Sequence, residues 1–182
     1  MALECWRGRL AVSQVGRRTV QALLPVLAEW LRRRHGRLTY RMTQLLTGHG
    51  CFGAFLHRIG REEVPGCHHC NLDTVDTAEH TLQECPAWAD ERAALNICIG
   101  NDLSLPVLVH HMTNGEEAWR GVLTFCEAVI SQKEAAERER EASPDAPIAR
   151  RRRHGQRRRL YDLHLPLPNR PRPSDTGVSG GV

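Results

Sequence analysis

The sequence predicts a small, mainly α-helical domain with one structural metal loop and a disordered, basic C-terminal tail. Apolar residues recur at helical spacing in several segments before residue 142. Residues 67–85 contain three cysteines and three histidines, residue types that bind metal ions. From residue 142 onward arginine, proline, glycine and serine are abundant, a composition that favours disorder. The predicted order is a first helical segment (1–62), the metal loop (63–86), a second helical segment (87–141) and the tail (142–182).

Length and composition are those of one domain of ordinary size. The chain has 182 residues, of which 41% are hydrophobic. No apolar run is long enough to span a membrane, and the first residues do not resemble a secretory signal. We therefore expect an intracellular protein, nuclear or cytoplasmic, with no membrane partner. In such a reducing compartment the seven cysteines favour metal binding over disulfides.

The first predicted helix begins near Thr19 and continues to about His35, where Gly36 ends it. Pro25 lies inside this range and predicts a kink or a later start. Residues 1–15 show no clear periodicity. The apolar stripe of this helix comprises Val20, Leu23, Leu24, Leu27, Trp30 and Leu31.

Two short helices are predicted on either side of a glycine-rich turn. They span residues 39–46 and 52–59. Between them, Gly48-His49-Gly50 allows the backbone to pass close to another element or to a ligand. We expect Phe52 and Phe55, on the second of these helices, to pack in the core.

Three further helices are predicted after the metal loop. They span residues 87–97, 104–112 and 114–141. The last residues of the longest helix, 133–141, have no apolar face and predict a solvated extension. The expected apolar anchors are Trp88, Leu95 and Ile97 in the first of the three, and Trp119, Val122, Leu123, Cys126, Val129 and Ile130 in the longest.

The metal loop has the pattern C-x2-C-x9-H-x4-C, formed by Cys67, Cys70, His80 and Cys85. Three thiolates and one imidazole are a ligand set that Zn²⁺ prefers, and four protein ligands leave no position for water. The loop is therefore predicted to be a zinc knuckle with one structural zinc. His68 and His69 are rival ligands, but His80 completes a second spaced pair with Cys85.

The distribution of charge favours nucleic acid as a partner. The net charge is +4, and Lys133 is the only lysine, so almost all positive charge is arginine. The arginine fork matches the geometry of phosphate. Solvated basic faces are the alternative for each cluster, and His49 either caps and packs or contacts nucleic acid. The expected nucleic-acid-binding residues are Arg32, Arg33, Arg34, Arg41 and Arg58, together with the arginine blocks of the tail.

The chain offers no convincing catalytic motif, and we expect no catalytic residues in it. Pro65, Gly66 and Cys67 through Cys70 are similar to the P-C-x-x-C half of zinc deaminases. Those enzymes also need an upstream H-x-E, and no histidine before the loop is followed by such a glutamate. The sequence therefore predicts a binding or interaction domain.

Two segments together resemble a known family. Residues 44–50, QLLTGHG, precede Cys51-Phe52-Gly53 and Leu56-His57-Arg58-Ile59. These residues resemble the segment after the reverse transcriptase in non-LTR retrotransposon polyproteins of arthropods. Cys67, Cys70, the run 76–80 (DTAEH) and Cys85-Pro86 resemble the C-terminal zinc knuckle of the same polyproteins. The resemblance covers roughly residues 10–130.

The resemblance implies a parent polyprotein with an endonuclease and a reverse transcriptase. It implies that this region binds template RNA or target DNA during target-primed reverse transcription, with Cys67, Cys70, His80 and Cys85 as zinc ligands. The Tyr-x-Asp-Asp motif of the polymerase is absent from this sequence, so we expect no polymerase activity here. Two alternatives remain open: an interaction module that docks onto the polymerase domain, and a non-functional relic.

Overall fold

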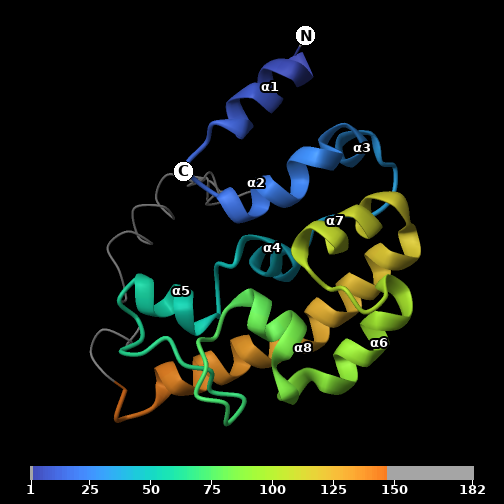
Figure 1. Cartoon of the computed structure of the whole chain (residues 1–182). Coiled ribbons are helices and arrows are strands. Elements are labelled where there is room, and N and C mark those ends of the chain that lie inside the picture. Colours follow the sequence, from blue (N-terminus) through green and yellow to red (C-terminus); the bar gives the residue numbers. More distant parts are fainter. Residues whose placement is uncertain (1, 147–182) are drawn as a thin grey trace, which may run out of the picture. The chain divides into compact units, whose positions relative to one another are not determined.

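The longest helix, α8 (Glu116–Ala142), crosses the fold and provides the surface on which other helices pack (Figure 1). The structure is a computed structural model that describes residues 2–146. Within this range α8 packs against α4, α6 and α7, and α2 packs against α7. The predicted tail lies outside the described residues from residue 147 onward. The other α-helices are α1 (Ala2–Ala11), α2 (Arg17–Leu23), α3 (Leu27–Arg32), α4 (Tyr40–Thr47), α5 (Gly53–Arg58), α6 (Ala89–Ile99) and α7 (Leu105–Asn114).

The mainly helical class is confirmed for the described residues. They contain no β-strand, and their one isolated bridge pairs Gly66 with Val75. No helix formed by residues 2–146 combines the length and the apolarity that crossing a bilayer requires.

The apolar stripe of α8 is the centre of the core. Buried residues recur three and four positions apart, so that they share one face of the helix. Leu123, which we expected in the stripe, is only partly buried, whereas Phe125 is buried and was not predicted. The buried apolar residues of α8 are Ala118, Trp119, Val122, Phe125, Cys126, Val129 and Ile130.

The first predicted helix is interrupted where proline predicts it. A 3₁₀ turn over Leu24–Val26 separates α2 from α3, because Pro25 has no N–H to donate and its ring clashes with the preceding turn. The chain preceding α2 forms α1, which we did not predict. No residue of α1 is buried. A helix that buries no face needs no apolar periodicity, so the sequence carried no signal from which α1 could be predicted.

The two short predicted helices, 39–46 and 52–59, form as α4 and α5, with each bound shifted by one residue. The Thr39 side chain accepts a hydrogen bond from Met42 N at 3.2 Å and caps α4. At the other end, Gly48 adopts a left-handed conformation (φ 71°) and donates to the Gln44 carbonyl at 2.8 Å. Gly50 (φ 110°) lies against the Gln44 side chain, whose amide oxygen accepts a hydrogen bond from Cys51 N at 3.1 Å. The close backbone approach predicted for this turn is therefore present.

The helices after the metal loop differ from expectation in their bounds. Residues Pro86–Trp88 form a 3₁₀ turn, and α6 extends to Ile99. The prediction of Ile97 as a core anchor is wrong, because its side chain is 86% exposed. Ile99, four residues after Leu95 and therefore on the same helical face, is buried instead. Asn114 ends α7 and does not begin α8.

The expected solvated extension of α8 is also wrong. Lys133 is fully buried and Glu137 nearly so, although residues 133–141 contain no large apolar side chain. The polar side chains of residues 133–141 therefore extend the buried face of α8. Among them, Glu134 accepts hydrogen bonds from Arg41 and Gln44 of α4. Polar contacts thus fix this end of α8 to the first half of the chain.

Candidate metal centre

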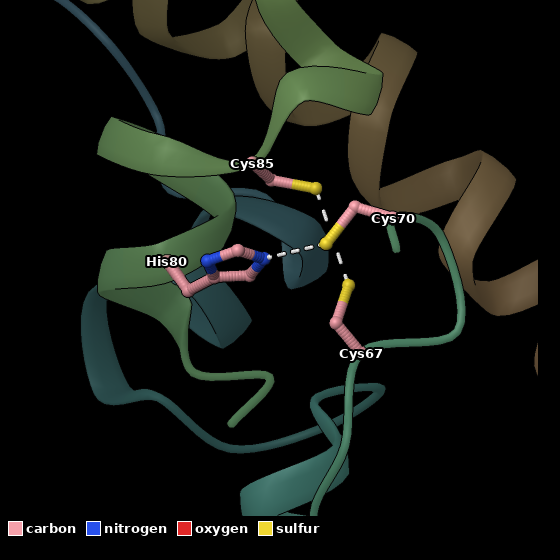
Figure 2. A group of neighbouring side chains, drawn as sticks. All are labelled: Cys67, Cys70, His80 and Cys85. Carbon is pink, nitrogen blue, oxygen red and sulfur yellow. Dashed lines mark hydrogen bonds between the residues drawn. The ribbon is translucent and has the colours of Figure 1, made fainter. Parts of the chain in front are cut away.

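Four side chains from two segments converge on one point (Figure 2). The ligand atoms of Cys67, Cys70, His80 and Cys85 all lie within 4.8 Å of one another. The Sγ atoms of Cys67 and Cys85 are 4.0 Å apart, and Cys70 Sγ is 3.4 Å from His80 Nε2. Ligands of a tetrahedral zinc with Zn–S bonds of about 2.3 Å lie roughly 3.5–3.8 Å apart. This cluster of three cysteines and one histidine could therefore hold a metal ion without large movements.

A short hairpin-like loop positions the first pair of cysteines. Cys67 N donates to the Thr74 carbonyl at 2.9 Å, and Asp76 N donates to the Pro65 carbonyl at 2.8 Å. These bonds close the loop at its base, while Asp73 takes a positive φ of 44°. Cys67 and Cys70 therefore lie in a loop whose ends are held together.

A π-helical turn, His80–Glu84, positions the second pair. Cys85 N donates to the His80 carbonyl at 2.7 Å, the five-residue hydrogen bond of a π-helix. A histidine and a cysteine five residues apart thereby point to the same side. At the start of the turn, His80 N donates to Thr77 Oγ1 at 3.0 Å.

The cluster is partly desolvated, because His80 and Cys85 are buried and Cys67 and Cys70 are partly buried. Burial raises the pKa of the Cys67 thiol, and burial also raises the pKa of Cys85 to about 12. A metal ion that binds here must therefore displace the protons of these thiols. Its positive charge then stabilises the thiolates, which burial alone disfavours. His69 N donates to Cys67 Sγ at 3.5 Å, and His80 Nδ1 lies 3.5 Å from Glu84 Oε2. A carboxylate behind the imidazole is the usual support of a metal-bound histidine.

The two rival histidines lie off the cluster. His68 is exposed, and its Nε2 is 3.2 Å from Glu62 Oε1. The His69 ring packs against Trp88, with ring centroids 5.1 Å apart. Within the described residues, the four ligands named from spacing are the ones that the structure brings together.

A buried ion pair supports the metal loop, and sequence reasoning missed it. Asp76 is 2% exposed, and its two carboxylate oxygens accept hydrogen bonds from Lys133 Nζ at 2.7 and 2.9 Å. The same carboxylate accepts from Gly53 N at 2.8 Å and from Thr81 Oγ1 at 3.3 Å. Asp76 thus joins α5, the π-helical turn and α8. The sequence did contain a signal for this burial. The only lysine, Lys133, lies three residues after Ile130, at the helical spacing of the apolar stripe.

The five predicted nucleic-acid-binding arginines divide into two groups. The guanidinium of Arg33 lies 4.0 Å from the Trp30 ring centroid and 4.6 Å from that of Trp119. Arg41 pairs with Glu127 and Glu134, and its hydrogen bonds to these carboxylates raise its pKa. Both side chains are thus engaged within the fold. Those of Arg32, Arg34 and Arg58 are exposed.

Comparison with known proteins points to one class. Over 142 residues the chain is 26% identical to a retrovirus-related Pol polyprotein from type-1 retrotransposable element R1 4 of Nasonia vitripennis, covering 75% of this chain and 34% of that relative. Over 100 residues it is 35% identical to a retrovirus-related Pol polyprotein from type-1 retrotransposable element R1 of Bradysia coprophila, covering 53% of this chain and 9% of that relative.

The homologues are thus retrotransposon Pol polyproteins, and the chain matches only a minor part of their length. No protein-family model matches the chain. No solved structure matches it either. The similarity supports a fragment of a retrotransposon polyprotein, in agreement with the family expected from residues 44–50 and from the cysteine and histidine spacing.

Proposed function

We propose that this chain is a zinc-stapled nucleic-acid-binding region of a non-LTR retrotransposon polyprotein, acting on RNA or DNA in target-primed reverse transcription. The observation that carries the proposal is the convergence of Cys67, Cys70, His80 and Cys85 in a chain similar to Pol polyproteins. The polymerase and endonuclease chemistry belongs to other parts of the parent polyprotein. Reduced thiolates suit the nucleus or the cytoplasm, where we place the protein.

The metal in this proposal is one Zn²⁺ with a structural role. Four protein ligands complete its tetrahedral shell, so no position is left for a reactive water. The ion joins the hairpin-like loop to the π-helical turn, two segments with few apolar groups of their own. When bound, zinc supplies the cross-link that holds this region in one conformation.

Exposed arginines supply the phosphate contacts in this proposal. Arg32, Arg34 and Arg58 are exposed, and the tail adds the blocks 150–153 and 157–159. The guanidinium groups of Arg33 and Arg41 are already engaged within the fold. We therefore assign these two a supporting role: Arg33 by packing on two tryptophans, and Arg41 by fixing α4 to α8.

The engagement of Arg33 and Arg41 also favours a second candidate function. Arginines that already contact tryptophans or carboxylates of the same fold are less available to phosphate. The region can then serve as an interaction module that docks onto the reverse transcriptase domain of the parent polyprotein. In that case nucleic acid is bound by other parts of the polyprotein. The two functions differ in what happens when the exposed arginines are changed.

A binding titration tests the proposal. We expect the zinc-loaded full chain to bind RNA and duplex DNA, with log affinity falling against log salt concentration. The three exposed arginines of the folded region contribute a slope of about −2 on single-stranded RNA and about −3 on duplex DNA, and the tail arginines make the slope of the full chain steeper. Filter binding at several salt concentrations measures this slope. A chain with glutamine at the tail arginines 150–153 and 157–159 retains salt-dependent binding if the folded region contributes.

Two comparisons decide between the candidates. Arg32→Glu combined with Arg34→Glu weakens RNA binding under the first function and leaves it unchanged under the docking function. Cys67→Ser, which removes one ligand, weakens binding only if the zinc-held fold takes part. Binding that follows the tail arginines alone would show that the chain acts as a polycation, and the proposal would then be wrong.

A further inference from the structure

A polar recess lies between the start of α2, the turn joining α4 to α5, and the segment that leads into His80. Its volume is about 340 Å³, the size of a small-ligand pocket. The lining includes Arg17, Arg18, His49, Phe55, Arg58 and Glu79. Neither the metal cluster nor the core explains this gathering of basic and aromatic groups.

Positive charge is in excess at the recess. Glu79 is the only acidic residue of the lining, and Arg18 Nε donates to its carboxylate. The same arginine donates through Nη1 to the carbonyls of Leu45 and Leu46, at 2.8 and 2.6 Å. Arg18 is therefore fixed in place, and its charge is balanced by Glu79. Arg17 and Arg58 remain, both exposed and neither in an ion pair within residues 2–146.

A planar surface lies beside this charge. The exposed His49 ring packs against Phe55, with centroids 4.7 Å apart and planes 32° from parallel. The Arg58 guanidinium lies 5.1 Å from the Phe55 ring centroid. Unpaired bases stack on aromatic, imidazole and guanidinium planes, and their phosphates bind arginine. Bases inside a duplex are already stacked and cannot enter such a recess.

One wall of the recess belongs to the metal loop. Thr77, Ala78 and Glu79 line the recess and directly precede the ligand His80. The hydrogen bond from His80 N to Thr77 Oγ1 connects these residues to the π-helical turn. A metal-held loop thus gives the recess one of its sides.

We infer that this recess binds a nucleotide of single-stranded RNA or DNA, with the phosphate on Arg17 and Arg58 and the base against His49. The inference rests on the proposed nucleic-acid-binding function and assigns it to a specific place in the fold. It adds Arg17 and His49 to the binding surface. It also predicts a preference for single strands over duplexes of the same sequence.

Fluorescence anisotropy with a short labelled single-stranded RNA, and with the duplex that contains it, tests the inference. The protein is the zinc-loaded full chain with glutamine at the tail arginines, which removes their non-specific contribution. Arg17→Gln combined with Arg58→Gln weakens single-strand binding about tenfold and lowers the salt slope by about one to two. His49→Ala weakens single-strand binding about tenfold with an unchanged salt slope, whereas His49→Phe retains it.

Arg120→Gln combined with Arg138→Gln is the matched control. Both side chains are exposed, at 70% and 63%, and neither residue lines the recess. The double change removes the same charge from α8, and we expect single-strand affinity to stay within about twofold of the parent chain. A loss equal to that of the recess variants would show a general charge effect and overturn the inference.

Photo-crosslinking gives an independent reading. A 5-iodouridine in the same RNA, irradiated in the complex, should crosslink to residues 16–18, 47–58 or 77–79, as mapped by mass spectrometry. Crosslinks confined to other residues would overturn the inference.

The outcomes for the recess and for the proposed function are distinguishable. If Arg32→Glu with Arg34→Glu abolishes binding and the recess variants bind like the parent, nucleic-acid binding stands and the recess does not. If the recess variants lose single-strand and duplex binding equally, the recess is a general phosphate surface and the single-strand assignment is wrong. If the tail-neutralised parent binds no RNA, the proposed function itself fails.

Discussion

At the scale of single residues, the contacts of Asp76 show how the metal loop is held from outside. Its carboxylate receives hydrogen bonds from a lysine, a backbone amide and a threonine hydroxyl while being almost fully buried. A buried carboxylate is stable only when its charge and its lone pairs are satisfied. Lys133 supplies that charge from α8, 57 positions away in the sequence.

Removing the charge of Lys133 should destabilise the fold strongly. Lys133→Met keeps most of the volume and leaves Asp76 as an uncompensated buried charge, for which we expect a loss of about 3–5 kcal/mol in the free energy of unfolding. Urea denaturation followed by circular dichroism measures the loss. Arg138→Met, an exposed change in the same helix, is the control and should stay within about 0.5 kcal/mol. A Lys133→Met chain as stable as this control would contradict the role of the pair.

At the scale of elements, α5 touches the base of the metal loop through a glycine. A Cβ atom at Gly53 would lie 2.8 Å from the Gly66 carbonyl oxygen and 2.9 Å from that of Pro65. Both are backbone atoms, and the Pro65 carbonyl also accepts the Asp76 N–H that closes the loop. The absence of a side chain at Gly53 therefore permits the loop to lie against the start of α5.

Gly53→Ala should push the loop away from α5. We expect a destabilisation of about 1–3 kcal/mol, because the added methyl group would meet backbone carbonyl oxygens of the loop, which have little room to move away. Weaker metal binding, measured by competition with a chromogenic chelator, should accompany it. Gly8→Ala is the contrasting variant: Gly8 lies in α1 with nothing within 4 Å of the added Cβ, and alanine there should stabilise the helix by about 0.5–1 kcal/mol. Equal effects of the two substitutions would refute the contact.

At the scale of the whole molecule, the metal cluster completes a core that α8 organises. Cys85 and His80 are buried beside Leu82 and Trp88, so the metal site and the apolar core are continuous. The loop over residues 67–75 contributes no buried residue to that core. Its conformation therefore depends on hydrogen bonds such as that from Cys67 N to the Thr74 carbonyl, and, under the proposed function, on the bound zinc.

Metal removal should consequently lower the stability of the described region. We expect one zinc per chain, measured by elemental analysis after dialysis, and a Tm lowered by about 10 °C or more after chelation. Cys85→Ser should lose the zinc and show the lowered Tm without chelator. Cys5→Ser removes an exposed thiol of α1 and should retain both zinc and Tm. Equal Tm values with and without metal would show that zinc is not a structural staple here.

Several features could be predicted from the sequence because they depend on local rules. Most of the α8 stripe follows from residue spacing, although Phe125 was not predicted and Leu123 is only partly buried. The break between α2 and α3 follows from the chemistry of Pro25. The cap at Thr39 and the stop at Gly48 follow from the chemistry of helix ends. The ligand set follows from the spacing of cysteines and histidine, and the structure brings those four residues together.

Other features could not be predicted because they depend on distant partners. Ile97 and Ile99 are equally apolar, and only the face that α6 turns toward α8 decides which of them is buried. Arg33 and Arg41 are as basic as the exposed Arg34, yet two tryptophans and two carboxylates engage them. Charge in a sequence does not indicate whether its counter-charge lies elsewhere in the same chain.

The sequence by itself determined the helical class and the basic character of this protein, and it predicted the cluster of Cys67, Cys70, His80 and Cys85, because each of these depends on residue type and short-range spacing. Only the tertiary structure decided that Lys133 and Asp76 form a buried pair and that the polar end of α8 is part of the interior. It alone placed Arg17, His49 and Arg58 around one recess. The physical reason is the same in each case: burial and electrostatic pairing are set by residues far apart in the chain, which only folding brings together.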